Sequence, residues 1–391
     1  MFLGMMMKMD VNIGILFSTS GSYRAVGESM RAGAELAISE INEDPCSLAK
    51  LVPVVIDPGG ITASYVTAAQ KLLCEKKITH IFGCYTSSSR KEVLPFFEKH
   101  DGLLWYPSHY EGFETSENIV YTGAAPNQHI LPLSKHLLEH HGNRGWFVGS
   151  NYVWAWENNR ILRERLMEVG GVVVGERYFP VGETDMMALA QQIVSDRPDF
   201  VFTTLIGKSG YAFFRALREA ANAAGIDQPN DMPVASCSLS EAELPAIGSA
   251  ASGHLSSSVY FSTINSPENN QFVSEWNRRF GDLGHACADA EATYNAVHLL
   301  SQAVTKAGSE GFTAVRDAVK SAQFNAPQGL VTVNPDNLHC AMRSRIGRSK
   351  SDGTFEILHS EAQPVQPDPY LVWSNSAKQP ELRGNHLRVV R

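Results

Sequence analysis

Short apolar runs alternate along the chain with longer segments in which apolar residues recur every three to four positions. The run Val11–Ser18 is followed by Gly27–Glu43, where the apolar residues fall on one face of a helix. The pattern predicts further strands at 51–57, 79–84 and 102–107 and further helices at 62–76 and 88–100. Strands that alternate with helices indicate right-handed crossovers and a parallel sheet covered on both faces.

An irregular stretch between Ser108 and Asn127 interrupts this alternation and is a candidate crossing between two lobes. Beyond it the pattern predicts strands at 146–150, 172–179, 199–205 and 233–236 and helices at 128–141, 156–169, 185–195 and 209–224. Helices are also expected at 267–280, 290–307 and 313–322, with a final strand pair around the turns at 335–337 and 351–353. The predicted fold class is α/β with two doubly wound parallel-sheet lobes, since one sheet rarely holds so many strands.

The composition is that of an ordinary globular protein and argues against several functional classes. The chain has 391 residues, which exceeds the usual size of one domain. A net charge of −8 disfavours direct binding to nucleic acid, and no run of about 18 apolar residues is present, which excludes insertion into a membrane. Six cysteines without a C-x-x-C pair favour reduced thiols over a disulfide framework.

The first residues, Met1–Asp10, contain no apolar run of the length that a signal peptide needs. If this start is the native one, the protein is expected in the cytoplasm. If a native signal peptide is missing from it, the expected location is the periplasm.

Ligands of parallel α/β sheets bind beyond the carboxyl ends of the strands, so the residues that follow the predicted strands are the first candidates for a site. We therefore expect a pocket built around the loops Gly83–Ser89 and Tyr106–Phe113, with Tyr152 and Trp154 after a further strand. Aromatic walls with a few polar groups suit a small-molecule pocket. Packing between the lobes is an alternative role for some of these aromatic residues.

Three serines, Ser87–Ser89, stand where a strand leads into a helix. The unpaired N–H groups and the dipole of a helix start favour an electron-rich ligand atom such as a carbonyl or carboxylate oxygen. Capping the helix is the alternative role for Ser87 or Ser88. Because capping needs only one of the serines, Ser87 is the stronger ligand candidate.

His136, Glu139 and His140 match the H-x-x-E-H pattern of a class of zinc enzymes. Both histidines lie opposite the apolar face of the predicted helix, which favours exposure to solvent over metal binding. We therefore predict no metal site.

Two other near-matches to catalytic or nucleotide-binding motifs are also rejected. Gly207–Ser209 follows a strand as a phosphate-binding loop would, but Phe202 occupies the position of the first glycine. Ser108, His109 and Glu111 crowd together, but no G-x-S-x-G elbow exists and adjacency in sequence does not give triad geometry. We therefore expect no enzymatic activity and no cofactor.

Two segments carry a resemblance to a known family. Gly83–Lys91 reads Gly-Cys-Tyr-Thr-Ser-Ser-Ser-Arg-Lys, and Tyr106–Glu114 reads Tyr-Pro-Ser-His-Tyr-Glu-Gly-Phe-Glu. With further matches at 118–121, 125–128, 240–243, 260–262 and 326–329, the chain resembles the type I periplasmic-binding-protein-like family, in its amide- and urea-binding branch. The resemblance extends from Gly14 to about Tyr370.

The resemblance implies two lobes that are joined by three hinge crossings and close like a clamshell on a ligand. The expected first lobe comprises residues 10–123 and 254–328, and the second comprises 124–253 and 329–373. Residues 374–391 are expected to form a peripheral polar tail.

The candidate ligand-binding residues follow from the resemblance and from the strand ends together. They are Tyr85, Ser87, Tyr106, Pro107, Ser108, Tyr152, Trp154, Gly207 and Ser238. An amide NH₂ group needs two acceptors and its carbonyl needs a donor, so an analogue without the NH₂ group would leave buried acceptors unpaired. The amide sensors have Thr-Pro in place of Ser108-His109 and tyrosine in place of Trp154, so a different ligand preference is expected here.

The resemblance implies two roles for a protein that binds a small amide or urea. The first is a cytoplasmic sensor that regulates amidase expression through a protein partner, an RNA-binding antiterminator. The alternative is the substrate-binding component of an ABC transporter for urea, short-chain amides or branched-chain amino acids. In either role, lobe closure reports the ligand through its differential affinity for the closed state. The oligomeric state stays open.

Overall fold

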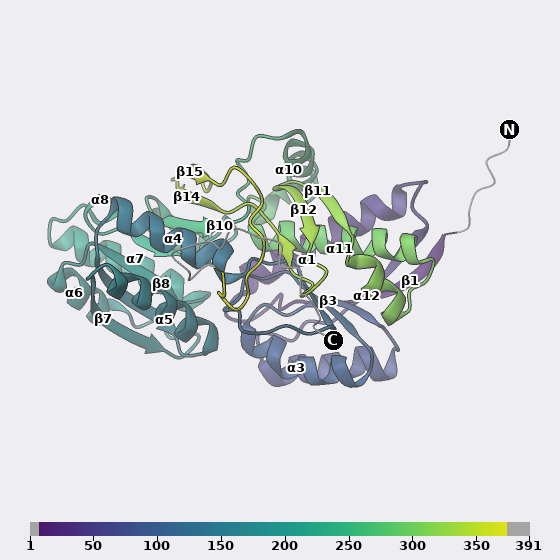
Figure 1. Ribbon diagram of the computed structural model, residues 1–391. Coiled ribbons are helices and arrows are strands. Elements are labelled where there is room, and N and C mark those ends of the chain that lie inside the picture. The colour runs from purple at the N-terminus through teal and green to yellow at the C-terminus, as the bar shows by residue number, and fades with distance from the viewer. Residues whose placement is uncertain (1–7, 374–391) are drawn as a thin grey trace, which may run out of the picture.

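Two parallel sheets, each with helices on both faces, lie side by side along residues 8–373, the part of the chain that the computed structural model describes (Figure 1). The expected tail at 374–391 lies outside the described residues. The predicted α/β class with two doubly wound lobes is confirmed. No helix within the described part is long and apolar enough to cross a membrane.

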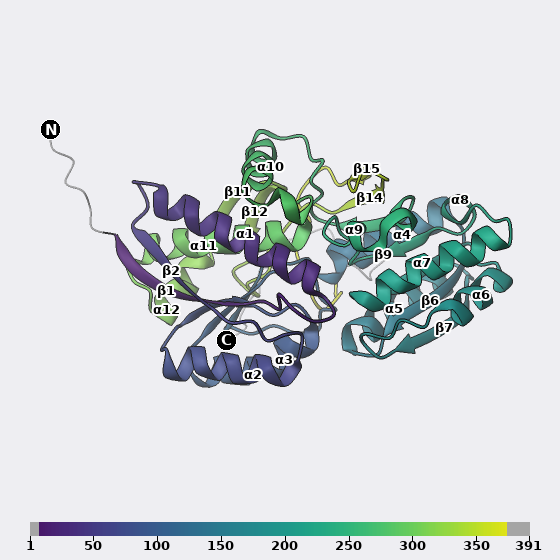
Figure 2. The same cartoon turned by 180° about the vertical axis from the view of Figure 1, so that it is seen from behind.

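The first sheet has the strand order β2-β1-β3-β4-β5, and all of its neighbouring pairs are parallel. Its strands are β1 (Met9–Leu16), β2 (Ala49–Val55), β3 (His80–Gly83), β4 (Leu103–Tyr106) and β5 (Ile119–Tyr121). One face packs on α1 (Arg24–Glu43) and α11 (Ala288–Ala307), and the other packs on α2 (Thr62–Gln70), which continues into η1 (Lys71–Glu75), and on α3 (Ser87–Lys99) (Figure 2).

The second sheet has the order β15-β14-β10-β9-β8-β6-β7. Its parallel strands are β6 (Arg144–Ser150), β7 (Val172–Phe179), β8 (Phe200–Thr204), β9 (Val234–Ser236) and β10 (Leu255–Ser258), to which β14 (Arg345–Ser349) and β15 (Phe355–Ser360) add an antiparallel pair. The helices α4 (Pro126–His140) and α5 (Val153–Glu168) cover one face, and α6 (Met187–Asp196) and α7 (Lys208–Ala223) cover the other.

The remaining elements complete the two halves. A small antiparallel sheet contains β11 (Gln323–Ala326), β12 (Gly329–Val333) and β13 (Cys340–Ala341). The helices α10 (Pro267–Phe280), with the turn η3 (Gly281–Leu283), and α12 (Phe312–Val319) accompany the first sheet, and the short α8 (Gln228–Asp231), α9 (Leu244–Ile247) and η2 (Gly248–Ala251) accompany the second.

The chain crosses between the two halves three times, after β5, after β10 and after β13. Three details differ from the expectation. The crossing expected after residue 253 falls later, because β10 pairs with β9 and β14 in the second sheet. The stretch from Ser108 to Asn127, expected to be irregular, contains β5. Residues 329–341 belong to the small sheet and not to the second one.

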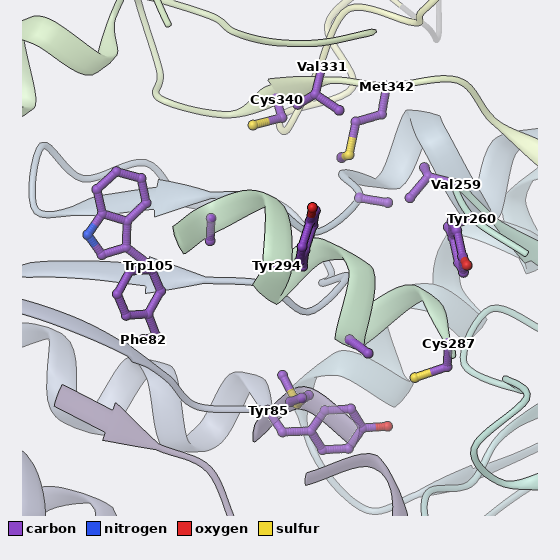
Figure 3. Close-up of a cluster of buried hydrophobic side chains, with 14 of the residues drawn as sticks. Phe82, Tyr85, Trp105, Val259, Tyr260, Cys287, Tyr294, Val331, Cys340 and Met342 are labelled. Carbon is purple, nitrogen blue, oxygen red and sulfur yellow. The ribbon is translucent and has the colours of Figure 1, made fainter. Parts of the chain in front are cut away.

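The first core is organised around the contact between α1 and α11. A Cβ atom at Gly33 would lie 2.2 Å from the carbonyl oxygen of Ala290, so only glycine lets these helices approach so closely. Figure 3 shows the side chains around α11, with Trp105 and Phe82 on the sheet side and Cys340 beyond the helix. The Trp105 and Phe82 rings stack with centroids 5.7 Å apart. This rigid layer ends at the loops that form the site.

Candidate functional site

A small cavity lies between the strand ends of the two sheets. Its lining side chains are Tyr85, Ser87, His109, Tyr152, Trp154 and Ile206. They follow β3 and β4 in the first sheet and β6 and β8 in the second, so both lobes contribute. About 10 Å³ of the cavity is open to the centre of a water-sized sphere, which is room for roughly one water molecule. The closed cleft therefore suits a small ligand.

The start of α3 delivers Ser87 to this cavity without using it as a cap. The N-cap is Thr86, whose hydroxyl oxygen accepts a hydrogen bond from the Ser89 N–H at 3.2 Å. Just before it, Cys84 has a φ of 65°, a left-handed conformation that is uncommon outside glycine and that turns the chain sharply after β3. The capping role considered for Ser87 and Ser88 therefore belongs to Thr86, and Ser87 is left to face the cleft.

The hydroxyl proton of Ser87 is already engaged. It is donated to the carboxylate of Glu111, whose other oxygen accepts from Arg90 at 3.1 Å. A carboxylate can only accept, so the proton of Ser87 points away from the cavity. The Ser87 oxygen also accepts a long hydrogen bond from the Arg90 Nη1 at 3.4 Å, which leaves one lone pair to accept a hydrogen bond from a ligand.

Arg90 holds this arrangement from a fully buried position. Its guanidinium lies 4.7 Å from the centroid of each of the Tyr106 and Tyr110 rings and donates to Glu114 at 2.6 Å. Burial alone would raise the pKa of Glu114, but the charge of Arg90 and its hydrogen bond lower it to about 2. Lys91 also pairs with Glu114 at 2.8 Å and with Glu111 at 3.5 Å, so the two carboxylates balance two cations, Arg90 and Lys91.

No side chain that lines the cavity carries a formal charge at neutral pH. Burial, aided by the nearby His129, lowers the pKa of His109 to about 3, so its imidazole is neutral. Burial also raises the pKa of Tyr85 and of Tyr152 far above the ordinary value, so both remain phenols. The lining is polar and uncharged.

Acidic side chains lie just behind this lining. Burial and the charge of Asp289 raise the pKa of Glu243 to about 8. Burial likewise raises the pKa of Asp289 to about 7, although Ser108 donates a hydrogen bond to it at 3.2 Å. The negative charge of either group raises the pKa of Tyr85 further, after burial. Glu243 therefore keeps its proton at neutral pH, whereas Asp289 titrates near neutrality.

Direct contacts hold the two lobes together over the cleft. The Lys208 N–H donates to the carbonyl oxygen of Ser22 at 3.1 Å, which joins the start of α7 to the loop after β1. Gly207, with a φ of 57°, lies so close that a Cβ atom there would stand 2.2 Å from the same oxygen. The structure therefore represents a closed state that requires glycine at this position.

Four of the nine candidate residues meet at the cavity: Tyr85, Ser87, Tyr152 and Trp154. The other five have different surroundings, namely Tyr106 donating to the Tyr85 carbonyl, Ser108 bonded to Asp289, Gly207 against Ser22, Ser238 bonded to Ser236, and Pro107 lining a neighbouring cavity. His109 belongs to the expected pocket loop but not to the nine candidate residues, and Ile206, which directly follows a predicted strand, belongs to neither. An apolar side chain such as Ile206 gives no chemical signal in the sequence.

The expected pocket loop Tyr106–Phe113 contributes only its first part. The Tyr110 hydroxyl bonds to His339 and to the Glu114 carbonyl, away from the cavity. The Phe113 side chain is 41% exposed, and its N–H donates to the carbonyl of Pro369. The second half of this loop is therefore anchored to the C-terminal segment, and it leaves only His109 at the cavity.

Comparisons with known proteins give a consistent picture. The family described as "Periplasmic binding protein domain" matches residues 11–376. "Leu/Ile/Val-binding protein homolog 6" of Brucella abortus (strain 2308) is 22% identical over 374 residues, which cover 92% of this chain and 93% of that protein.

Two solved structures share the fold. The first is a solute binding protein of an ABC transporter from Rhodopseudomonas palustris HaA2, in complex with p-hydroxybenzoic acid. Its TM-score is 0.83 and its sequence identity is 22%, and the match covers 94% of this chain and 100% of the solved chain. The second is the branched-chain amino acid transporter substrate binding protein LivJ from Streptococcus pneumoniae, in complex with isoleucine. Its TM-score is 0.78 and its sequence identity is 19%, and the match covers 91% of this chain and 100% of LivJ.

Rising pH is expected to destabilise the folded protein, and Glu243→Gln to reduce this effect. The folded state keeps a proton on Glu243 up to about pH 8, whereas the unfolded chain loses it near the ordinary pKa, so stability falls between these values. The variant reduces by one the difference in bound protons between the folded and unfolded states. It therefore lowers the pH dependence of the free energy of unfolding by at most about 1.4 kcal/mol per pH unit. Guanidinium unfolding at several pH values measures the slope; identical slopes in both proteins would contradict the assignment.

Gly207→Ala is expected to weaken ligand binding about tenfold or more, because its Cβ meets the Ser22 carbonyl only when the lobes close. Gly170→Ala is the matched control, since Gly170 also has a positive φ but nothing within 4 Å of its added Cβ. Calorimetry with urea or acetamide, the ligands that the sequence predicts, measures the affinity. Equal losses in both variants would show that backbone strain, and not closure, causes the effect.

Proposed function

Because the chain belongs to the periplasmic binding protein domain family, we propose that it closes its lobes on a small uncharged molecule with N–H groups, such as urea or a short-chain amide, as the substrate-binding component of an ABC transporter. The observation that carries the proposal is the uncharged lining of the cavity, with the Ser87 oxygen held as an acceptor.

A carboxylate ligand finds no cation in the cavity. The nearest buried cation is Arg90, which lies behind Ser87 and is already paired with Glu111 and Glu114. An anion buried without a partner costs several kcal/mol. The surroundings therefore favour an uncharged solute over an aromatic acid, the ligand named for the Rhodopseudomonas structure.

Hydrogen bonding distinguishes an amide from other neutral molecules. Ser87 can only accept from the ligand, because its proton is committed to Glu111. The Trp154 Nε1–H is buried and has no partner among the described residues, so it is available to a carbonyl oxygen. The Tyr85 side chain extends beyond the apolar cluster of Phe82 and Trp105 and supplies a further hydroxyl (Figure 3). One acceptor and several donors match the N–H and C=O groups of an amide.

The size of the cavity also favours a small amide. The cavity leaves room for about one water molecule in the closed state, so a ligand of a few non-hydrogen atoms requires the smallest adjustment of the lobes. Removing such a ligand from water costs little and leaves no buried charge.

Branched-chain amino acids are the second candidate. Glu243 and Asp289 lie beside Tyr85 and would attract the ammonium group of an amino acid, which would in turn favour their ionised forms. The names of the Brucella relative and of LivJ agree with this chemistry. It requires the cleft to open enough for a branched side chain.

The same comparisons support the proposed biological role. Both matched structures come from transporter systems, which supports delivery of the solute to an ABC transporter over the sensor role expected from the amide-binding branch. Regulation of amidase expression through an antiterminator has no comparable support among these relatives.

Calorimetric titration of the purified protein with urea, acetamide, isoleucine and 4-hydroxybenzoate tests the proposal. Urea or acetamide is expected to bind at least tenfold more tightly than the charged ligands. Tighter binding of isoleucine would replace the proposal by the second candidate, and tighter binding of 4-hydroxybenzoate would contradict the charge argument.

Glu111→Gln is expected to weaken urea or acetamide binding about tenfold, since a glutamine NH₂ can donate to Ser87 and free its proton to point at the ligand. Glu114→Gln is the control, because Glu114 also pairs with Arg90 but does not contact Ser87. Thermal unfolding checks that both variants fold. Equal affinity losses in both would show that the charge of the cluster, and not the direction of the Ser87 proton, matters.

A further inference from the structure

A second cavity lies next to the first, at the crossings between the lobes. Its lining includes Pro107, His109, His129, Cys237 and Asp289, together with the backbone segment 257–259 that leaves β10. About 20 Å³ is open to the centre of a water-sized sphere. Like the first cavity, it is formed by residues of both halves.

His109 is the side chain that the two cavities share. Its ring packs edge-on against Trp154 at 5.3 Å between centroids on one side and against His129 at 5.8 Å on the other. No hydrogen bond to the His109 ring is found among the described residues, so packing alone holds the ring between the cavities. Removing it would join the two spaces.

The second cavity offers acceptors that the first lacks. The Nε2 atom of His129 bonds to the carbonyl oxygen of Tyr110 at 2.9 Å, which places the proton on Nε2 and leaves Nδ1 as an acceptor. His129 is fully buried and its Nδ1 has no partner among the described residues. Asp289, whose carboxyl accepts a hydrogen bond from Ser108, also lines this cavity. An unpartnered buried acceptor is costly and is satisfied by a donor that enters the cavity.

We propose that His109 is the partition that limits ligand length, and that the cavity behind it is a second subsite, which takes a hydroxyl or amino group at the far end of a longer amide. The proposal rests on the proposed function, because it takes the amide group to lie in the first cavity. His109 therefore determines specificity by its volume, and His129 and Asp289 determine which chemical group is accepted beyond it.

The test compares acetamide, butyramide and 4-hydroxybutyramide by calorimetry on the wild-type protein and on His109→Ala. The wild-type protein is expected to bind acetamide at least about tenfold more tightly than butyramide, since the extra methylenes meet the His109 ring. His109→Ala is expected to bind butyramide at least as tightly as acetamide, and 4-hydroxybutyramide about tenfold more tightly than butyramide, because only its hydroxyl reaches an acceptor.

Ile206→Ala is the matched control. It also enlarges the first cavity but leaves the partition in place, so it is expected to show no preference for the hydroxyl over the methyl end. His109→Ser, which shortens the side chain in the same way, is measured in parallel, and thermal unfolding checks that each variant folds.

The outcomes separate the two proposals. If the wild-type protein binds acetamide but both His109 variants keep its order of affinities, the partition is wrong and the proposed function stands. A hydroxyl preference of equal size in Ile206→Ala would also overturn the second subsite. If the wild-type protein binds none of the amides, the proposed function fails and the inference fails with it.

Discussion

The burial of Arg90 is the constraint on which the site depends. A guanidinium removed completely from water requires opposite charge close by, and Glu111 and Glu114 provide it from the loop after β4. Once Glu111 is fixed by this pairing, it also fixes the proton of Ser87. The charge cluster of Arg90, Glu111 and Glu114 in the first lobe therefore determines which ligand groups the adjacent uncharged cavity can bind. Because Lys91 pairs with the same two carboxylates, removing either carboxylate would leave one anion for two cations.

The second lobe contributes side chains to the same cavity. The contact of Gly207 with Ser22 seals the cleft, and it carries Trp154 and Ile206 against Ser87 and His109. Burial, followed by the charge of Asp289, raises the pKa of Glu243 to about 8, so this carboxyl keeps its proton at neutral pH. Ligand affinity, lobe closure and proton uptake are thus linked through one desolvated space.

The sequence predicted the architecture well because alternating strands and helices leave a clear periodicity, but it missed elements that lack this signal. The strand β10 reads Leu-Ser-Ser-Ser, and the hydroxyls of Ser256 and Ser257 bond to the carbonyls of Leu239 and His129, so a polar segment becomes a central strand. At the site, strand ends identified four of the six side chains that line the cavity, two from each lobe. Contacts across the cleft, such as that of His109 with Trp154, join residues of different lobes, so no local pattern in the sequence predicts them.

The most direct test of the account is a crystal structure of the protein with urea or acetamide bound. The account predicts the ligand between Ser87 and Trp154, with a ligand nitrogen within hydrogen-bond distance of the Ser87 Oγ and the Lys208 N–H still bonded to Ser22. A ligand outside this cavity, or one that places an oxygen instead of a nitrogen against Ser87 while Ser87 remains bonded to Glu111, would contradict it.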